Sequence, residues 1–356
     1  MKKYSCKTCN AELYWDSKAG CLMCEYCGSK FQISDFDESE NIEEKERKEP
    51  TQEVADKEDV ATDESESSDL VIYKCSECGA EIITAKSTIA TTCAYCGRAI
   101  ALTNKIVGKF KPDSVIPFAI DEEKAKEIYK KYCQSSFLTP KHFKDENEIK
   151  KMKGIYVPFW LHSFKNNASG VLSCENTTTK RDGDDKVVIH HQYNVNMEAK
   201  GVFDKIPTDG LKTLDNALMD AIEPFNYDNM QDFNPAYMAG YYAEEYNESN
   251  KETQQRAFTR AETAMKQEMI ANAGSYEKKA ITIYNDNISK YSSKYVMLPV
   301  WLFNTEYKGK KYTFAINGDS GKITGKLPIS FSKLFGSITA SVIITQLISL
   351  FVRIFA

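Results

Sequence analysis

The chain lacks the residue patterns that mark several common enzyme classes. Only 4 histidines occur among its 356 residues, namely His142, His162, His190 and His191. The sequence contains no P-loop, no G-x-S-x-G nucleophile elbow, no H-E-x-x-H zinc-protease motif and no dinucleotide-binding fingerprint. His190 and His191 follow a strand-like run at 187–189, and neighbouring strand residues point to opposite faces of a sheet. We therefore expect His190 and His191 to have surface roles. The missing motifs indicate that the protein is neither an ATP-driven motor nor another enzyme.

Aromatic residues are missing from the segment 37–69. This segment holds 15 acidic and 4 basic residues, a net charge of −11, so it cannot bury enough apolar surface to fold. We expect a disordered acidic linker here. Because the whole chain carries −5, the remainder carries +6, and two zinc ions each held by four thiolates reduce that to about +2. Such a remainder lacks the charge excess of a protein built mainly to bind nucleic acid.

The N-terminus has no apolar run that fits a signal peptide, which predicts a cytoplasmic protein. Most of the 11 cysteines lie in Cys-x2-Cys pairs, a spacing typical of metal sites rather than of secreted disulfide scaffolds. In a reducing compartment such thiols stay reduced and available to metal. Two isolated cysteines, Cys133 and Cys174, are expected to pack as small apolar groups.

Two segments share the spacing Cys-x2-Cys-x14-Cys-x2-Cys and predict zinc ribbons at 1–36 and 70–104. The predicted ligands are Cys6, Cys9, Cys24, Cys27, Cys75, Cys78, Cys93 and Cys96. Four thiolates complete a zinc tetrahedron and leave no open position for water, so we expect two structural zinc ions. Cys21 offers a second choice of ligand pair in the first ribbon. The equivalent position in the second ribbon is Ala90, which favours Cys24 and Cys27.

Residues 105–330 have the composition of a packed α+β domain. We expect a strand at 115–118, a helix at 121–135 that Asp121 caps, a helix at 251–273 that ends at Gly274, and a hairpin within 307–326. The strand-like segments 157–161 and 298–302 resemble each other, each with proline near its start. This echo leaves a duplication of two related halves as an open alternative.

The segment 334–352 contains 19 residues without a charge, long enough to cross a hydrocarbon core. Lys322, Lys326 and Lys333 precede it, which predicts a single C-terminal pass with the bulk of the chain on the cytoplasmic side of the cell membrane. Ser337, Ser341, Thr345 and Ser349 form a ridge of small side chains, typical of helix packing in lipid. An interfacial helix, a buried core segment and one half of a longer hairpin remain the alternatives.

Several motifs resemble those of a bacterial family. These motifs lie at 73–81, 93–97, 110–113, 115–118, 154–161, 298–302, 307–310 and 314–318. They resemble transcription factor IIB-type zinc-ribbon proteins, which are common in Gram-positive bacteria and are also labelled primosomal replication-restart helicase-like subunits. The resemblance implies zinc binding by the eight paired cysteines and implies no substrate or catalytic residue.

These observations predict a non-enzymatic, membrane-tethered zinc adaptor that recruits protein partners at the cytoplasmic face. The acidic linker would keep the two ribbons close to each other and raise their effective concentration. The alternative is a nucleic-acid-associated zinc-ribbon factor in DNA replication or transcription, without a helicase motor of its own. Salt-sensitive binding to DNA or RNA would favour that alternative.

Overall fold

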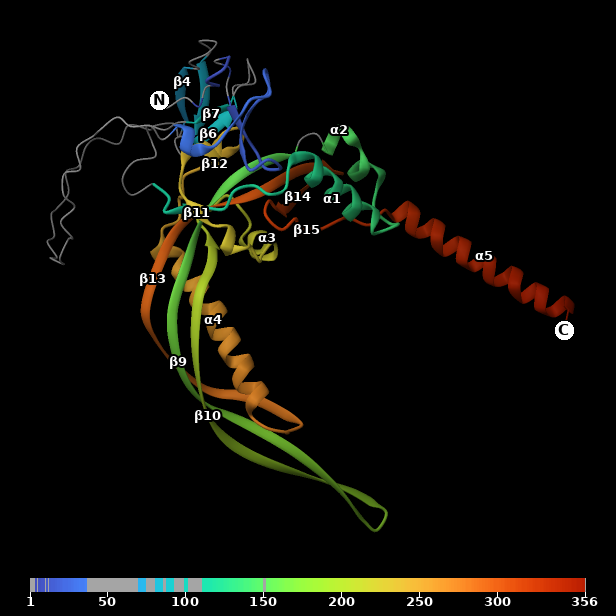
Figure 1. The fold of residues 1–356 in the computed structure, drawn as a ribbon. Coiled ribbons are helices and arrows are strands. Elements are labelled where there is room, and N and C mark those ends of the chain that lie inside the picture. The colour runs from blue at the N-terminus through green and yellow to red at the C-terminus, as the bar shows by residue number, and fades with distance from the viewer. Residues whose placement is uncertain are drawn as a thin grey trace.

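The computed structural model has a mixed α+β fold built on one curled, largely antiparallel sheet (Figure 1). It describes residues 4, 6–9, 11, 13–36, 111–149 and 152–355, together with the strands between 70 and 101. The expected acidic linker at 37–69 lies outside the described residues.

The N-terminal module is a small three-stranded sheet. Its elements are β1 (Leu13–Asp16), β2 (Cys21–Cys24), β3 (Lys30–Phe31) and a 3-10 turn (Ile33–Phe36). β1 pairs with β2, and β2 with β3, both antiparallel. Leu13, Trp15 and Leu22 are buried in its core, which gives the module an apolar centre despite its size.

Four further strands lie between the acidic segment and the main body. They are β4 (Leu70–Lys74), β5 (Glu81–Ala85), β6 (Thr88–Thr92) and β7 (Ala99–Ala101). β4 pairs with β5, and β6 pairs with β7. β6 also pairs with β12 (Tyr242–Glu244), so the main sheet continues into this part of the chain.

Three very long strands dominate the main sheet: β9 (Lys153–Asp182), β10 (Asp185–Asp209) and β13 (Lys278–Tyr307). β9 pairs with β10 on one side and with β13 on the other, both antiparallel. Shorter strands extend the sheet: β8 (Ser114–Val115), β11 (Gln231–Asp232), β14 (Lys310–Asn317) and β15 (Ile323–Gly325). The lower parts of the three long strands project from the body as a curved arm (Figure 1).

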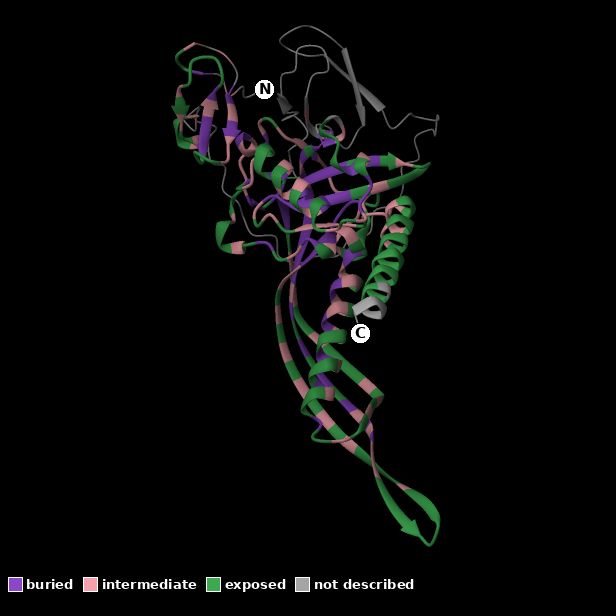
Figure 2. Ribbon diagram, turned by 90° about the vertical axis from the view of Figure 1, so that its right-hand side faces the viewer, coloured by how far each residue is buried: buried purple, intermediate pink, exposed green. Residues whose placement is uncertain are grey.

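The upper part of the sheet is buried on both faces (Figure 2). Along β9, Tyr156 and Trp160 face one core, and Val157 and Phe159 face the other. This alternation follows from the two-residue period of a strand, and burial on both sides explains the continuous apolar run in the sequence. Tyr129 of α1 packs into the first core.

The described α-helices lie around the sheet, except the last, which extends away from the body (Figure 1). They are α1 (Glu122–Gln134), α2 (Glu146–Ile149), α3 (Asn216–Ala221), α4 (Asn250–Asn272) and α5 (Phe331–Phe355). α4 packs along one face of the arm, where Met265 and Met269 are buried against β9 residues such as Leu172. The two echoing segments of the sequence lie next to each other, because Val157 pairs with Leu298 in the β9–β13 ladder.

Most of the predicted elements of the body are confirmed. Asp121 caps α1 by accepting from the backbone N–H of Lys124, and Gly274 follows α4 with a φ of +89° that suits glycine. β14 and β15 form the predicted hairpin. The strand expected at 115–118 is shorter, since β8 ends at Val115 and Pro117 offers no N–H to a ladder.

Candidate metal centre

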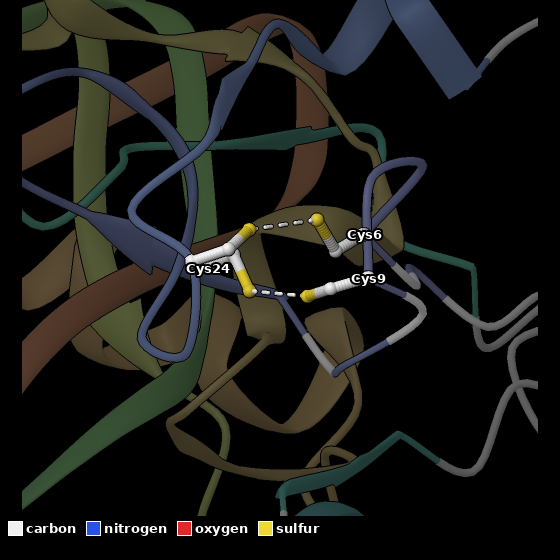
Figure 3. Close-up of side chains that lie close together, drawn as sticks. Cys6, Cys9 and Cys24 are labelled. Carbon is white, nitrogen blue, oxygen red and sulfur yellow. Dashed lines mark hydrogen bonds between the residues drawn. The ribbon is translucent and has the colours of Figure 1, made fainter.

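Four cysteines of the N-terminal module gather at one point. Cys6 and Cys9 lie in the turn before β1, Cys24 ends β2, and Cys27 lies in the turn that follows. Their four Sγ atoms all lie within 4.8 Å of one another. The Sγ atoms of Cys6 and Cys27 are 3.4 Å apart, and those of Cys9 and Cys24 are 3.5 Å apart (Figure 3). A tetrahedron with Zn–S bonds of about 2.3 Å has edges of about 3.8 Å, so this arrangement fits zinc.

Backbone turns aim these thiols inward. The N–H of Cys6 donates to the carbonyl of Ala11, and the N–H of Gly28 donates to the carbonyl of Cys24. Gly28 has a φ of +71°, a backbone conformation that glycine adopts without strain. Each Cys-x2-Cys segment therefore closes into a knuckle that presents two sulfurs on one side.

The thiols differ strongly in acidity. Burial raises the pKa of Cys6, but the backbone N–H groups of Cys9 and Thr8 outweigh it and lower this pKa to about 6. The backbone N–H of Ala11 lowers the pKa of Cys9, but burial and the other three cysteines of the cluster outweigh it and raise this pKa to about 12. Thus the first thiolate to form in the cluster opposes ionisation of the others. A bound cation removes this opposition and allows all four sulfurs to act as thiolates.

The spare thiols lie apart from this cluster. Cys21 begins β2, is buried, and pairs with Asp16 across the β1–β2 ladder. Cys133 and Cys174 are fully buried in the body, as expected for packed apolar groups. The second predicted set, Cys75, Cys78, Cys93 and Cys96, lies outside the described residues. The structure therefore shows one four-cysteine cluster that can bind a metal such as zinc.

The N-terminal module is docked on the body. The ring centroid of Trp15 lies 4.7 Å from that of Tyr237, in an edge-on contact. The hydroxyl of Tyr4 donates to Asn234 Oδ1 over 2.8 Å, and Lys18 pairs with Asp121 at 2.7 Å. Sequence reasoning missed this contact, because nothing in the spacing of the cysteines indicates which body residues the ribbon touches.

A buried polar network is the strongest candidate for catalytic chemistry in the body. The ring of His162 is fully buried, with Nδ1 2.9 Å from the Tyr291 hydroxyl and Nε2 2.9 Å from Thr208 Oγ1. Burial lowers the pKa of His162 to about 4, and the Arg256 cation adds to this effect. The imidazole is therefore neutral, and both of its nitrogens already have partners.

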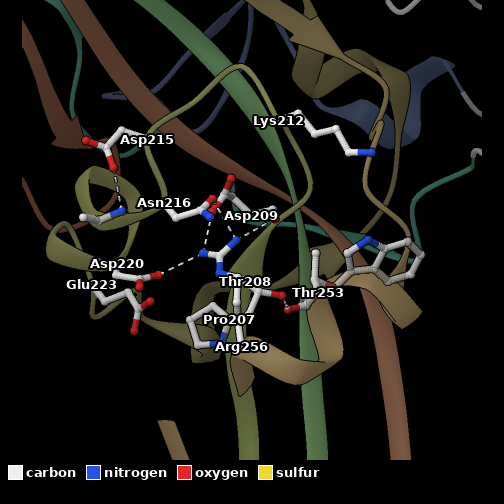
Figure 4. A network of polar contacts seen from close by, with 12 residues as sticks. Pro207, Thr208, Asp209, Lys212, Asp215, Asn216, Asp220, Glu223, Thr253 and Arg256 are labelled. Atoms are coloured by element: carbon white, nitrogen blue, oxygen red, sulfur yellow. Dashed lines mark hydrogen bonds and ion pairs between the residues drawn. The ribbon is translucent and has the colours of Figure 1, made fainter. Parts of the chain in front are cut away.

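Arg256 of α4 is the centre of a second set of polar contacts beside this one (Figure 4). Its guanidinium donates to Asp209 Oδ1 at 2.8 Å, to Asn216 Oδ1 at 2.9 Å and to Asp220 Oδ1 at 3.2 Å. One turn further along α4, Arg260 makes two bonds with the Glu223 carboxylate. These contacts tie α4 to the end of β10 and to α3. Their partners are distant in the sequence, and the only local signal was the four-residue spacing of the two arginines.

α5 is the second feature that bears on function. Its segment Phe331–Ser349 has 19 residues and a mean hydropathy of 1.4, and none of it is buried inside the protein. It is thus long and apolar enough to cross a membrane. The alternative of a segment buried in this chain's own core does not hold: Lys333, Leu334 and Ser337 are half-buried, and the other described residues of α5 are exposed.

These features define a mixed α+β protein with an N-terminal four-cysteine cluster and one exposed apolar C-terminal helix. The chain is 30% identical over 331 residues to the protein named "Uncharacterized protein YdjG" of Bacillus subtilis (strain 168). The match covers 93% of this chain and 91% of that relative, and the chain belongs to the same family as YdjG. No protein-family model and no solved structure matches the chain.

Proposed function

We propose that this protein is a non-enzymatic zinc-binding adaptor, anchored in the membrane by α5, that recruits protein partners at the cytoplasmic face. The exposure of α5 carries the proposal. Val342, Ile343 and Ile344 are consecutive, so they cover three sides of the helix, and each is more than half exposed. A helix that exposes large apolar side chains on several sides needs either a protein core or a lipid bilayer around it.

The charges beside α5 support a cytoplasmic body. Lys322, Lys326 and Lys333 precede the charge-free segment, and only Arg353 follows it. Basic residues are retained on the cytoplasmic side of spanning helices. The lysines before the segment favour an orientation with the ribbons and the sheet in the cytoplasm.

The four-cysteine cluster supports a structural role for zinc. Four sulfurs fill the coordination sphere, so no position stays open for a reacting water. Zinc would fold the N-terminal ribbon and stabilise its docking on the body. We propose the same role for a second ion held by Cys75, Cys78, Cys93 and Cys96.

The tip of the ribbon supports protein recruitment. Tyr26 lies in the knuckle between Cys24 and Cys27, and 86% of its surface is exposed. Exposed tyrosines held on rigid turns are frequent anchors at protein interfaces. Two lysines of the ribbon have internal partners instead, since Lys7 donates to the carbonyl of Asp35 and Lys18 pairs with Asp121. These contacts favour a protein partner over a phosphate backbone.

The anchor is tested by carbonate washing of membranes from the native host. The double substitution Ile343→Lys with Ile344→Lys places two charges at the middle of the span, at a cost of about 3 kcal/mol each. We expect the wild-type chain to resist the wash, and the variant, like a chain ending at Pro328, to be released. Val202→Lys on the arm is the matched control, because Val202 is also an exposed apolar residue, at 73%. An equally soluble wild-type chain would contradict the anchor.

Recruitment is tested by a photo-crosslinking residue at position 26 in living cells, with position 202 as the control. We expect discrete crosslinked proteins at position 26 that disappear when Cys24→Ser is added, because the knuckle needs its metal. Crosslinked nucleic acid in place of protein would instead support a nucleic-acid-associated factor.

A further inference from the structure

Large apolar side chains are exposed where α5 leaves the body. The exposed fractions are 72% for Phe137, 54% for Ile329, 65% for Phe331 and 65% for Phe335. Phe137 belongs to the loop after α1, whereas the other three belong to α5 or to the segment before it. We call the loop after α1 together with the start of α5 the base of α5. In Figure 1 this base lies at the border of the body, and α5 runs outward from it.

Direct contacts hold the loop against the first turn of α5. The N–H of Ser330 donates to the carbonyl of Leu138 over 2.9 Å. The Lys333 ammonium donates to the carbonyls of Phe137 and Thr139, at 3.2 and 2.7 Å, and lies 5.7 Å from the centroid of the Phe137 ring. Phe137 therefore lies level with Lys333, the last charge before the charge-free segment.

The two chain segments that meet at this base carry positive charge only. Residues 128–144 include four lysines and no acidic residue, and residues 320–352 include three lysines and no acidic residue. One of these lysines, Lys130, is paired with Glu146 at 2.9 Å. Lysines near an anionic leaflet are attracted to its surface.

We propose that Phe137, Ile329 and Phe331 insert into the headgroup region of an anionic bilayer and hold the body against the membrane. This inference rests on the proposed span of α5. A spanning α5 would place these side chains at the level of the headgroups, and the lysines of the two segments, with Lys333 directly beside Phe137, match lipid phosphates. A fixed base would then orient the ribbons relative to the membrane surface.

A second copy of this chain fits the same surface poorly. Two such patches facing each other would bring lysines against lysines, with no acidic residue in either segment to offset the repulsion. A lipid surface supplies both the apolar layer and the negative charge. The charge pattern therefore favours lipid as the occupant.

Tryptophan fluorescence of the full chain in vesicles tests this proposal. Three variants are reconstituted in equimolar phosphatidylcholine and phosphatidylglycerol, each with one added tryptophan: Phe137→Trp, Ile343→Trp in the span, and Tyr26→Trp on the ribbon as an exposed aromatic control. The native tryptophans are at most 9% exposed and give a background common to all variants. Quenching is measured with lipids brominated either near the headgroup or near the chain ends.

We expect the emission of the tryptophan in Phe137→Trp to shift to the blue when the protein is in vesicles. Its fluorescence should fall more with bromine near the headgroup than with bromine near the chain ends. Ile343→Trp should lose more with bromine near the chain ends, and Tyr26→Trp should be unaffected by either lipid. If Phe137→Trp behaves like Tyr26→Trp while Ile343→Trp is quenched, the docking surface is wrong and the span stands. If Ile343→Trp is not quenched, the proposed span fails and the docking surface with it. Equal quenching of Phe137→Trp in pure phosphatidylcholine would overturn the preference for anionic lipid.

Discussion

Cys21 and Cys24 provide a matched test of the metal centre. Both lie on β2, both are buried, at 4% and 1% exposure, and a substitution by serine removes the same atom from each. Only Cys24 belongs to the four-sulfur cluster, where its Sγ lies 3.5 Å from that of Cys9. Any difference between Cys21→Ser and Cys24→Ser therefore reports the metal rather than the loss of a buried thiol.

The expected magnitudes are well separated. Structural zinc sites contribute about 10–16 kcal/mol of apparent binding free energy near neutral pH, and loss of one of four thiolates removes much of it. A buried hydroxyl in place of a thiol costs about 1–3 kcal/mol. We therefore expect Cys24→Ser to unfold the ribbon and Cys21→Ser to leave it folded.

The assay is zinc content per chain by atomic emission, on full-length protein purified in detergent under reducing conditions. Cys21→Ser should hold as much zinc per chain as wild type, which is two ions if the proposed second site is also filled, and Cys24→Ser should hold one ion fewer. Limited proteolysis should then cut the ribbon only in Cys24→Ser. Full zinc retention by Cys24→Ser, or an equal loss from Cys21→Ser, would refute this assignment of the ligands.

Three further predictions concern the docking of the ribbon and the buried polar groups of the body. Trp15→Ala removes the contact with Tyr237 and should increase cleavage of the ribbon by trypsin while zinc content stays unchanged, whereas unchanged cleavage would contradict docking through Trp15. Arg256→Met leaves the buried Asp209 carboxylate without its cation and should lower the free energy of unfolding by about 3–5 kcal/mol, with part of the loss recovered when Asp209→Asn is added. The pKa of His162 falls from 6.5 to about 4 on folding, so the unfolded chain binds a proton that the folded chain does not. The free energy of unfolding should therefore decrease by up to about 3 kcal/mol as the pH falls through this window, and thermal melts of His162→Gln should lack that component.

Local signals in the sequence predicted the elements whose ends are set by single residues. Asp121 marks the start of α1, and Gly274 marks the end of α4, because caps act within one helical turn. The cysteine spacing likewise indicated which thiols gather, since each knuckle is a local turn. The apolar, charge-free terminal segment likewise indicated α5, because the length and composition of a helix of this kind are read directly from the sequence.

Features that depend on distant partners were not predictable in this way. The continuous apolar run at the start of β9 gives way to polar residues in the arm. Nothing in the sequence therefore showed that β9 continues for 30 residues. The pair His190 and His191 lies within β10 rather than at the end of a short strand. The bond from Arg256 to Asp209 spans 47 residues and forms only when α4 packs on the sheet.

The order of strands in the arm has a consequence for folding. β9 and β10 are consecutive and can form a hairpin as soon as both are synthesised, whereas β13 pairs with the other edge of β9 and begins at Lys278, far along the chain. Until β13 is in place, that edge of β9 presents unpaired N–H and carbonyl groups to other chains. Closing so long a loop is slow, which makes the interval before β13 pairs the stage most exposed to aggregation. We therefore expect the yield of folded protein to depend on how fast residues 278–307 reach a strand made more than 90 residues earlier.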